Sequence, residues 1–217
     1  MTDSEVIAEP LAGEDRERRQ SRRPLRRVCV FCASSDGASR VYADAAVMLG
    51  RLIARRGIGL VYGGGDVGLM GVIADAALDA RGEVIGVIPH ALVDRELAHH
   101  RLTRLHVVDS MHERKMLMAD LSDAFVLLPG GYGSLEEFCE AITWLQLGIH
   151  NKSCGILNVS GYYDALIAQF DHSVNEGFVR RPHRQALIVE TEPETLLLRL
   201  QEAPPIKEIK WVSDSER

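Results

Sequence analysis

Short, almost wholly apolar runs alternate along this chain with longer segments in which apolar residues recur every three or four positions. A bend rich in glycine or small residues follows most of the apolar runs. Near-continuous hydrophobicity is typical of strands covered on both faces, whereas a period of three or four residues is typical of amphipathic helices. The pattern predicts strands at residues 28–33, 58–62, 84–88, 104–108, 124–128, 154–158 and 186–190.

The segments between these strands complete the prediction of the fold. Helical spacing is clear through residues 42–53 and again through residues 69–80. We therefore expect one α/β domain, a doubly wound, Rossmann-like and mainly parallel sheet of about seven strands flanked by helices. Such sheets bind ligands beyond the carboxyl ends of their strands, so functional residues are expected in the loops after residues 33, 62, 88, 109 and 128.

The two ends of the chain show no such period. Residues 1–24 mix acids, arginines, glycine and proline, and residues 204–217 lie beyond the last predicted strand. Segments of this kind do not bury enough apolar surface to fold by themselves. We expect a disordered N-terminal tail at 1–24, one folded domain at 25–203 and a C-terminal tail at 204–217.

Composition narrows the classes of partner and the expected location. A formal net charge of −6 argues against a general nucleic-acid partner. No segment approaches the roughly 20 apolar residues of a membrane span, and no signal-peptide pattern opens the sequence. A cytoplasmic protein without a membrane partner is therefore expected.

Cys29 and Cys32 form a C-x-x-C pair, a spacing found in redox sites and zinc sites. Both lie inside a predicted strand, where positions three apart point to opposite faces. We therefore expect two separate core thiols in a reducing compartment.

A first glycine-rich loop, "GGGDVGLMG", follows the second predicted strand and matches G-x-G-x-x-G. The next strand ends without the acid that would hold the ribose of a dinucleotide, and no Gly-Lys-Ser/Thr of a phosphate-binding loop follows. Backbone N–H groups at a helix start still favour an anion. Contact with a phosphate or nucleotide is predicted, and a tight turn needing glycine only for packing is the alternative; the residues concerned are Gly63, Gly64, Gly65 and Gly68.

A second loop, "LLPGGYGSLEEF", also joins a strand to a helix. Its three glycines leave N–H donors exposed where the helix dipole is positive, which suits a phosphate. Ser134 is predicted to be the N-cap, and Ser134-x-x-Glu137 would then be a capping box. Glu137 thus has two interpretations from the pattern alone, a reactive carboxylate or a partner of the N-cap amide.

The segment "DSMHERKMLMAD" places Arg114 and Lys115 one turn inside a helix predicted to begin near Asp109 or Ser110. Cations near a helix start oppose the helix dipole, so stability does not explain them. A guanidinium at this edge can bind phosphate or carboxylate in a bidentate manner. An exposed basic pair beside Glu113 is the alternative.

Adjacent histidines at positions 99 and 100 raise the question of a metal site. Neighbouring residues point in different directions, and no H-E-x-x-H or paired ligand spacing accompanies them. We expect no metal and no cofactor.

These motifs together resemble the Lonely Guy (LOG) family of cytokinin riboside 5′-monophosphate phosphoribohydrolases, which are often mislabelled lysine decarboxylases. The resemblance spans residues 27–198 and includes, in chain order, "YGGGDVGLMG", "GVIP", "HERK" and "PGGYGSLEE". Ser134 stands where the family motif has threonine, so the hydroxyl is kept. A pyridoxal enzyme would need a lysine in a cofactor site, and none of the four lysines has a recognisable setting of that kind.

The resemblance implies release of an adenine-type base and ribose 5-phosphate from an N6-modified adenosine 5′-monophosphate, by a homodimer. It assigns catalysis to Arg114 and Glu137, and it assigns substrate binding to Glu96, Lys115, Gly130, Gly131, Tyr132, Gly133, Ser134, Leu135 and Glu136. Two alternatives stay open. One is a plain AMP nucleosidase, and the other is a nucleotide or cofactor carrier without turnover.

Overall fold

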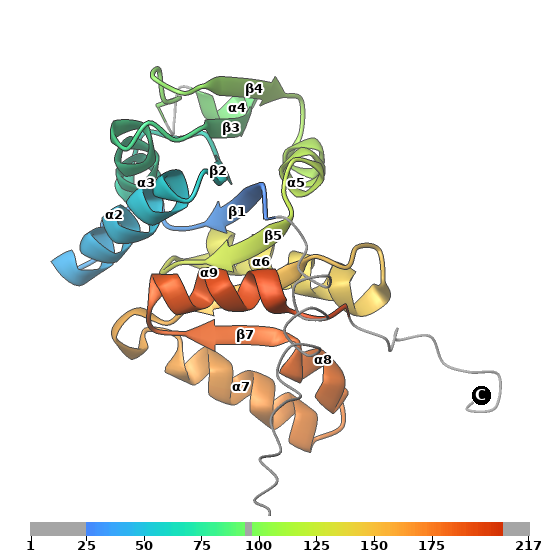
Figure 1. Cartoon of the computed structure of the whole chain (residues 1–217). Helices are drawn as coiled ribbons and strands as arrows, with labels where there is room; N and C mark the ends of the chain where they lie inside the picture. The colour runs from blue at the N-terminus through green and yellow to red at the C-terminus, as the bar shows by residue number, and fades with distance from the viewer. Residues whose placement is uncertain (1–24, 94–96, 206–217) are drawn as a thin grey trace, which may run out of the picture.

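The computed structural model describes residues 25–93 and 97–205 (Figure 1). Seven parallel strands form one sheet in the order β4-β3-β2-β1-β5-β6-β7. The predicted N-terminal tail, most of the predicted C-terminal tail and the predicted substrate residue Glu96 lie outside the described residues. All seven predicted strands are confirmed, with ends that shift by at most two residues; they are β1 (Arg27–Phe31), β2 (Gly59–Tyr62), β3 (Val84–Pro89), β4 (Arg104–Val108), β5 (Ala124–Leu127), β6 (Ser153–Leu157) and β7 (Leu187–Glu190).

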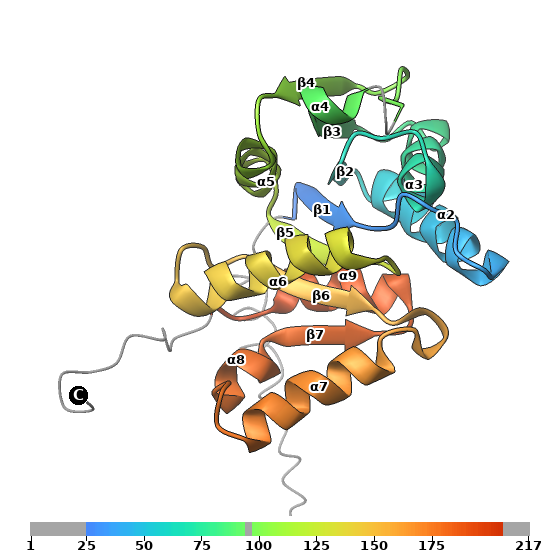
Figure 2. The ribbon, with the colours of Figure 1, turned by 180° about the vertical axis from the view of Figure 1, so that it is seen from behind.

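Helices cover both faces of this sheet, as Figures 1 and 2 show from opposite sides. One face carries α2 (Arg40–Arg55), α3 (Gly68–Asp79) and α9 (Pro193–Glu202). The other carries α5 (Met111–Asp120), α6 (Tyr132–Leu147) and α7 (Asp164–Asn175). Short elements complete the chain: α4 (His90–Val93), η1 (Val159–Gly161) and α8 (Arg181–Gln185). Among the helices that the structure describes, none is both long and apolar enough to cross a membrane.

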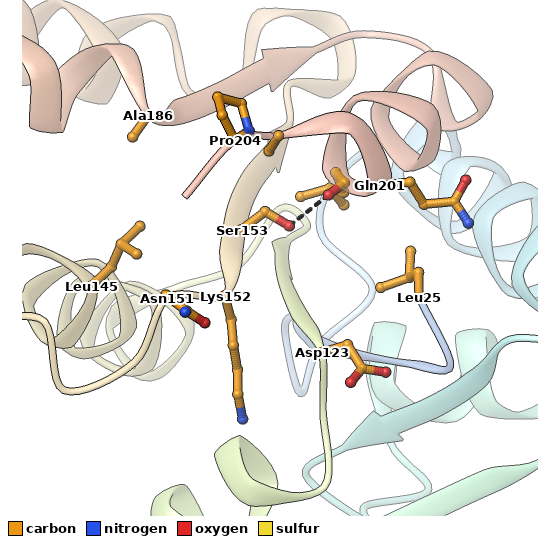
Figure 3. Close-up of a pocket in the computed structure, with 11 residues that line it drawn as sticks. Leu25, Asp123, Leu145, Asn151, Lys152, Ser153, Ala186, Gln201 and Pro204 are labelled. Atoms are coloured by element: carbon orange, nitrogen blue, oxygen red, sulfur yellow. Dashed lines mark hydrogen bonds between the residues drawn. The ribbon is translucent and has the colours of Figure 1, made fainter. Parts of the chain in front are cut away.

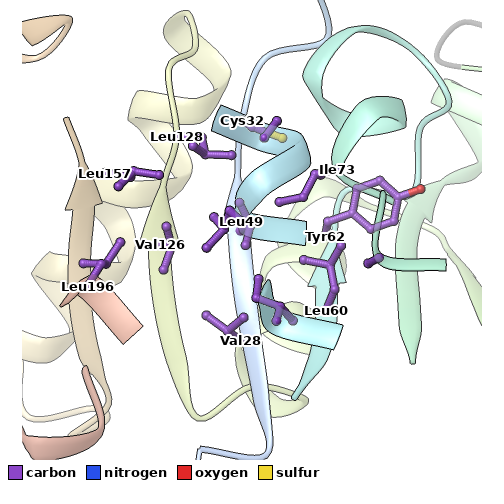
Figure 4. Packing of buried hydrophobic residues seen from close by; sticks show 14 of the residues in the cluster. Val28, Cys32, Leu49, Leu60, Tyr62, Ile73, Val126, Leu128, Leu157 and Leu196 are labelled. Atoms are coloured by element: carbon purple, nitrogen blue, oxygen red, sulfur yellow. The ribbon is translucent and has the colours of Figure 1, made fainter. Parts of the chain in front are cut away.

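The apolar core is divided by the sheet into two clusters. Alternate residues of β1 enter different clusters, because side chains of a strand point to opposite faces in turn. Val28 (Figure 4) and Val30 pack under α2 and α3, whereas Cys29 and Phe31 pack under α5 and α6. Cys32 joins the first cluster, so the prediction of two separate core thiols is confirmed.

The strand order decides where a ligand can bind. The chain builds the sheet outward from β1 to β4 and then returns to the centre to place β5 on the other side of β1. The loops that leave β1 and β5 therefore diverge, and a crevice opens between them at the carboxyl edge. The second glycine-rich loop follows β5 and so lies at this crevice.

His150, in the connection before β6, provides a test of the fold by pH. Its ring packs on Phe125 with centroids 5.2 Å apart, and its Nδ1 accepts the backbone N–H of Lys152 at 3.2 Å. Burial, followed by the charge of Lys152, lowers the pKa of His150 from 6.5 to about 4. The unfolded chain therefore binds this proton first as the pH falls, and the folded state loses stability between pH 6.5 and pH 4.

We expect His150→Gln to remove this part of the pH dependence, on the order of 2 kcal/mol because the ring is only partly buried. Urea unfolding at pH 7, 5.5 and 4 measures the difference between the two proteins. The exposed His100 provides the matched control, His100→Gln, which should follow the wild type. Equal slopes for all three proteins would contradict the assignment.

Candidate active site

A hollow of about 320 Å³ lies at the carboxyl edge of the sheet, in the crevice that the strand order predicts. Its walls come from five places in the chain: the loop after β1, the start of α3, α4, the first turn of α5 and the start of α6. Segments far apart in the sequence thus meet at one pocket. The lining residues are Cys32, Ala33, Ser34, Ser35, Met70, Leu92, Met111, Arg114, Gly131, Tyr132, Gly133, Ser134, Glu136 and Glu137.

Helix α6 begins earlier than the sequence predicts. Its first residue is Tyr132, its N-cap is Gly131, and no side chain caps it. The predicted capping box of Ser134 and Glu137 is therefore wrong, because Ser134 is already inside the first turn. A Cβ on Gly130 would lie 2.2 Å from the Ser134 hydroxyl oxygen, so the glycine lets the serine pack against the backbone. Capping accordingly does not account for Glu137.

The start of α6 directs backbone donors at the pocket. Leu135 is the first residue of the helix whose N–H bonds back along the chain, to the carbonyl of Gly131 at 3.1 Å. The N–H groups before it have no acceptor within the helix, and they lie at the positive end of its dipole. Tyr132 stands at this end with 94% of its surface exposed. Such a helix start binds phosphate readily.

Helix α5 begins at Met111, close to the start that the sequence predicts. Ser110 is the N-cap, and its hydroxyl accepts the N–H of Glu113 at 3.1 Å. The Glu113 carboxylate in turn accepts the N–H of Asp109 at 2.8 Å. Side chains next to the helix start accept these N–H groups, so the stability of the helix start does not explain the presence of Arg114.

Arg114 is buried, with only 4% of its surface exposed. Its Nε donates to the carbonyl of Val87 at 3.0 Å, and its Nη2 donates to the carbonyl of Gly63 at 2.8 Å. The guanidinium therefore joins the carboxyl ends of β2 and β3 while also lining the pocket. The alternative of an exposed basic pair is wrong for this residue.

Lys115 links α5 to α6. Its Nζ lies 2.5 Å from Oε1 of Glu136 and 3.0 Å from Oε2 of Glu140. Burial lowers the pKa of Lys115, but its hydrogen bonds with the two carboxylates outweigh burial, so the pKa lies above its ordinary value. The lysine is thus fully charged and paired, and it supports the helix that carries Glu136 and Glu137.

The predicted site residues divide into two groups in space. Seven of them line the pocket: Arg114, Gly131, Tyr132, Gly133, Ser134, Glu136 and Glu137. Lys115 and Gly130 do not line the pocket but contact its lining residues Glu136 and Ser134, and Leu135 packs against the apolar core under α6. Glu96 is outside the described residues. The structure therefore brings together the two acids and the arginine that the sequence analysis singled out.

Comparison with known proteins gives a consistent relationship. Residues 70–200 match a protein family described as "Possible lysine decarboxylase". The "Probable cytokinin riboside 5'-monophosphate phosphoribohydrolase LOGL2" of Oryza sativa subsp. japonica is 47% identical over 192 residues, which cover 86% of this chain and 79% of the relative. The "Cytokinin riboside 5'-monophosphate phosphoribohydrolase LOG4" of Arabidopsis thaliana is 50% identical over 182 residues, covering 84% and 85%. The chain belongs to the LOG family.

A solved structure supports the fold of this LOG-family chain. The molybdenum cofactor carrier protein of Chlamydomonas reinhardtii matches with a TM-score of 0.60, covering 79% of this chain and 92% of that one. The two sequences share only 20% identity, so the likeness concerns the fold alone. The predicted Rossmann-like α/β architecture is confirmed.

The lysines give no support to the decarboxylase description of the LOG family. Schiff-base chemistry would need a lysine amine in a cofactor site. Lys115 is paired with two carboxylates, and Lys152 donates to the carbonyl of Ala119 at 2.5 Å. Lys152 lies beside a hollow of about 30 Å³ at the amino edge of the sheet (Figure 3), which has room for only a few waters. Lys207 and Lys210 lie outside the described residues.

The first glycine-rich loop has a packing explanation in this LOG-family structure. None of its four predicted glycines lines the pocket. A Cβ on Gly63 would lie 2.1 Å from Nη2 of Arg114, so this glycine makes room for the guanidinium. A Cβ on Gly68 would lie 2.2 Å from the backbone nitrogen of Ser35, which brings α3 against the loop after β1. Direct contact of Gly63, Gly64, Gly65 and Gly68 with a nucleotide stays a prediction.

Several lining residues were not identified from the sequence. Ser34 and Ser35 follow β1, where the fold prediction expected a functional loop, and adjacent small polar residues there were the signal. The apolar wall of Met70, Leu92 and Met111 had no such signal, because its members come from three separate elements. Burial, followed by the charge of Glu137, raises the pKa of the Cys32 thiol, and both residues line the pocket.

Proposed function

We propose that the protein hydrolyses the N-glycosidic bond of N6-modified adenosine 5′-monophosphates, releasing the free base and ribose 5-phosphate. The observation that carries this proposal is the meeting of Glu137, Arg114 and the uncapped start of α6 at one pocket. The relatives named above carry this activity in their names. The chain retains the residues that such chemistry requires.

The start of α6 is proposed to bind the 5′-phosphate. Its N–H groups and its dipole favour an anion, and Ser134 lies in the same turn. A phosphate there places the ribose along the next turn of the helix, where Glu136 and Glu137 line the pocket. Glu136 is held by its ion pair with Lys115, and we assign it to substrate binding.

Glu137 is proposed to be the reactive carboxylate. Cleavage of an N-glycosidic bond passes through a sugar cation, and a fixed carboxylate can stabilise this cation or orient the attacking water. Arg114 offsets the negative charge of phosphate and carboxylates and holds the ends of β2 and β3 in place.

The apolar wall bears on the choice of base. Met70, Leu92 and Met111 line the same pocket as the polar start of α6. An apolar wall suits adenine with a hydrophobic N6 substituent, whose burial is favourable. Plain AMP is the second candidate substrate, because the phosphate and ribose contacts would be the same. We also propose that the chain acts in the cytoplasm, and that it forms a homodimer, as the resemblance implies.

Whether free base is released, and from which nucleotide, distinguishes between these functions. We expect incubation with isopentenyladenosine 5′-monophosphate to yield free base by liquid chromatography, at higher kcat/KM than AMP. The unphosphorylated riboside is the control, and it should react at least 100-fold more slowly because it lacks the group bound by α6. Release from AMP alone would favour the nucleosidase, and binding of either nucleotide without release would favour the carrier.

A further inference from the structure

A second polar cluster lies outside the pocket, around the buried side chain of His99. This side chain is 2% exposed, and its Nε2 lies 3.2 Å from Asp75 and 3.5 Å from Asp66. Its Nδ1 accepts the backbone N–H of Arg101 at 3.1 Å. The Arg101 guanidinium also contacts Asp75, at 2.6 Å. None of these residues lines the pocket.

The hydrogen bonds of His99 oppose a metal at this cluster. Because Nδ1 accepts an N–H, the proton of the neutral ring lies on Nε2, which then donates toward the two carboxylates. A cation would have to displace this proton and the guanidinium of Arg101. The cluster is therefore better explained as an anchor made of hydrogen bonds and ion pairs.

The anchor joins two backbone segments. The N–H of His99 donates to the carbonyl of Gly64 at 3.0 Å, and the N–H of Asp66 donates to the carbonyl of Leu97 at 2.9 Å. Gly65 and Ala98 pair as an isolated antiparallel bridge. Leu97 adopts φ +48, an uncommon conformation for leucine that persists only where its surroundings impose it.

Each segment connects to a residue that lines the pocket. Gly63, next to the anchored Gly64, accepts the hydrogen bond of Arg114. On the other side, the N–H of Ala98 donates to the carbonyl of Val93 at 3.1 Å, the last residue of α4. Leu92, in the same short helix, lines the pocket. His99 thus bonds to Gly64, beside the Gly63 that contacts Arg114, and it follows Ala98, which bonds to the end of α4.

We propose that His99 is a positioning residue for substrate binding, which acts by fastening residues 97–99, and with them the end of α4, onto the first glycine-rich loop through Asp66 and onto α3 through Asp75. Without this anchor, α4 and Leu92 lose their fixed distance from the start of α6, while Glu137 keeps its place on α6. The effect should therefore fall on substrate affinity more than on the chemical step. The inference rests on the proposed function for its kinetic readout.

The test compares His99→Leu, which removes both ring nitrogens, with His99→Gln, whose amide can still donate to Asp75. We expect His99→Leu to raise KM for isopentenyladenosine 5′-monophosphate about 10-fold with kcat changed less than about 3-fold. His99→Gln should recover most of this loss. His100→Leu, at the exposed neighbouring position, is the matched control and should leave both parameters unchanged.

A melting temperature that falls while KM stays unchanged would overturn the proposal, since it would show a purely structural role. A fall in kcat at constant KM would also overturn it. If His99→Leu does not fold, Asp75→Ala removes the nearer carboxylate from the other side and should raise KM in the same direction; an unchanged KM would count against the anchor. Calorimetric Kd values for the nucleotide on each protein test the anchor even if the wild type releases no base, which separates its failure from that of the proposed function.

Discussion

Glu137→Gln is expected to lower kcat by a factor of about 10² to 10⁴ while leaving KM within about 3-fold of the wild type. The amide keeps the shape of the carboxylate but has no charge to stabilise a sugar cation or to orient water. Because α6 begins at Tyr132 without a side-chain cap, Glu137 is not needed to close the helix start. The melting temperature should therefore remain close to that of the wild type.

The neighbouring carboxylate provides the matched control for this result. Glu136 also lines the pocket, but it is paired with Lys115. Glu136→Gln should raise KM more than it lowers kcat, since we assign it to substrate binding. Turnover rates of both variants on isopentenyladenosine 5′-monophosphate distinguish the two roles. Near-normal kcat for Glu137→Gln would remove it from the chemistry.

Gly63→Ala is expected to destabilise the fold by about 2–4 kcal/mol and to reduce kcat/KM at least 10-fold. The added methyl would lie 2.1 Å from Nη2 of Arg114 and 3.1 Å from the sulfur of Met70. The guanidinium would have to leave the carbonyl of Gly63, to which it donates at 2.8 Å. The buried guanidinium of Arg114, which lines the pocket, would then lose one of its hydrogen-bond acceptors. Urea unfolding and steady-state kinetics measure the two effects.

A double-mutant cycle isolates the cause. On an Arg114→Ala background the methyl meets no guanidinium, so Gly63→Ala should cost much less stability than in the wild type. Gly133→Ala serves as the stability control, because a Cβ there would have no heavy atom within 4 Å among the residues that the structure describes. Equal costs of Gly63→Ala on both backgrounds would show that the glycine is required for another reason.

The two glycine-rich loops have different uses, although they look alike in sequence. In the loop after β5, glycine lets a helix start face the pocket with its N–H groups, and Gly130 makes room for Ser134. In the loop after β2, glycine makes room for Arg114, whose guanidinium occupies the space that a side chain would take. The loop that most resembles a nucleotide motif is thus the one that supports an arginine.

Most of the architecture followed from periodicity. Seven apolar runs separated by helical segments predict a parallel sheet, because strands covered on both faces must be apolar throughout. The carboxyl-edge location of the site followed from the same rule. The start of α6 was predicted three residues too late, since Ser134 satisfies the local preference for an N-cap while glycines at 130 and 131 let the helix begin sooner.

By itself the sequence determined the strands and the family, and it singled out the arginine and two of the acids that the structure places at one pocket. Only the tertiary structure decided that Arg114 is buried against Gly63 and Val87, that Lys115 is held by Glu136 and Glu140, and that His99 meets two aspartates. Local propensity and period depend on residues a few positions apart, whereas each of these contacts joins elements separated along the chain. Their geometry exists only once the sheet has brought those elements to one edge.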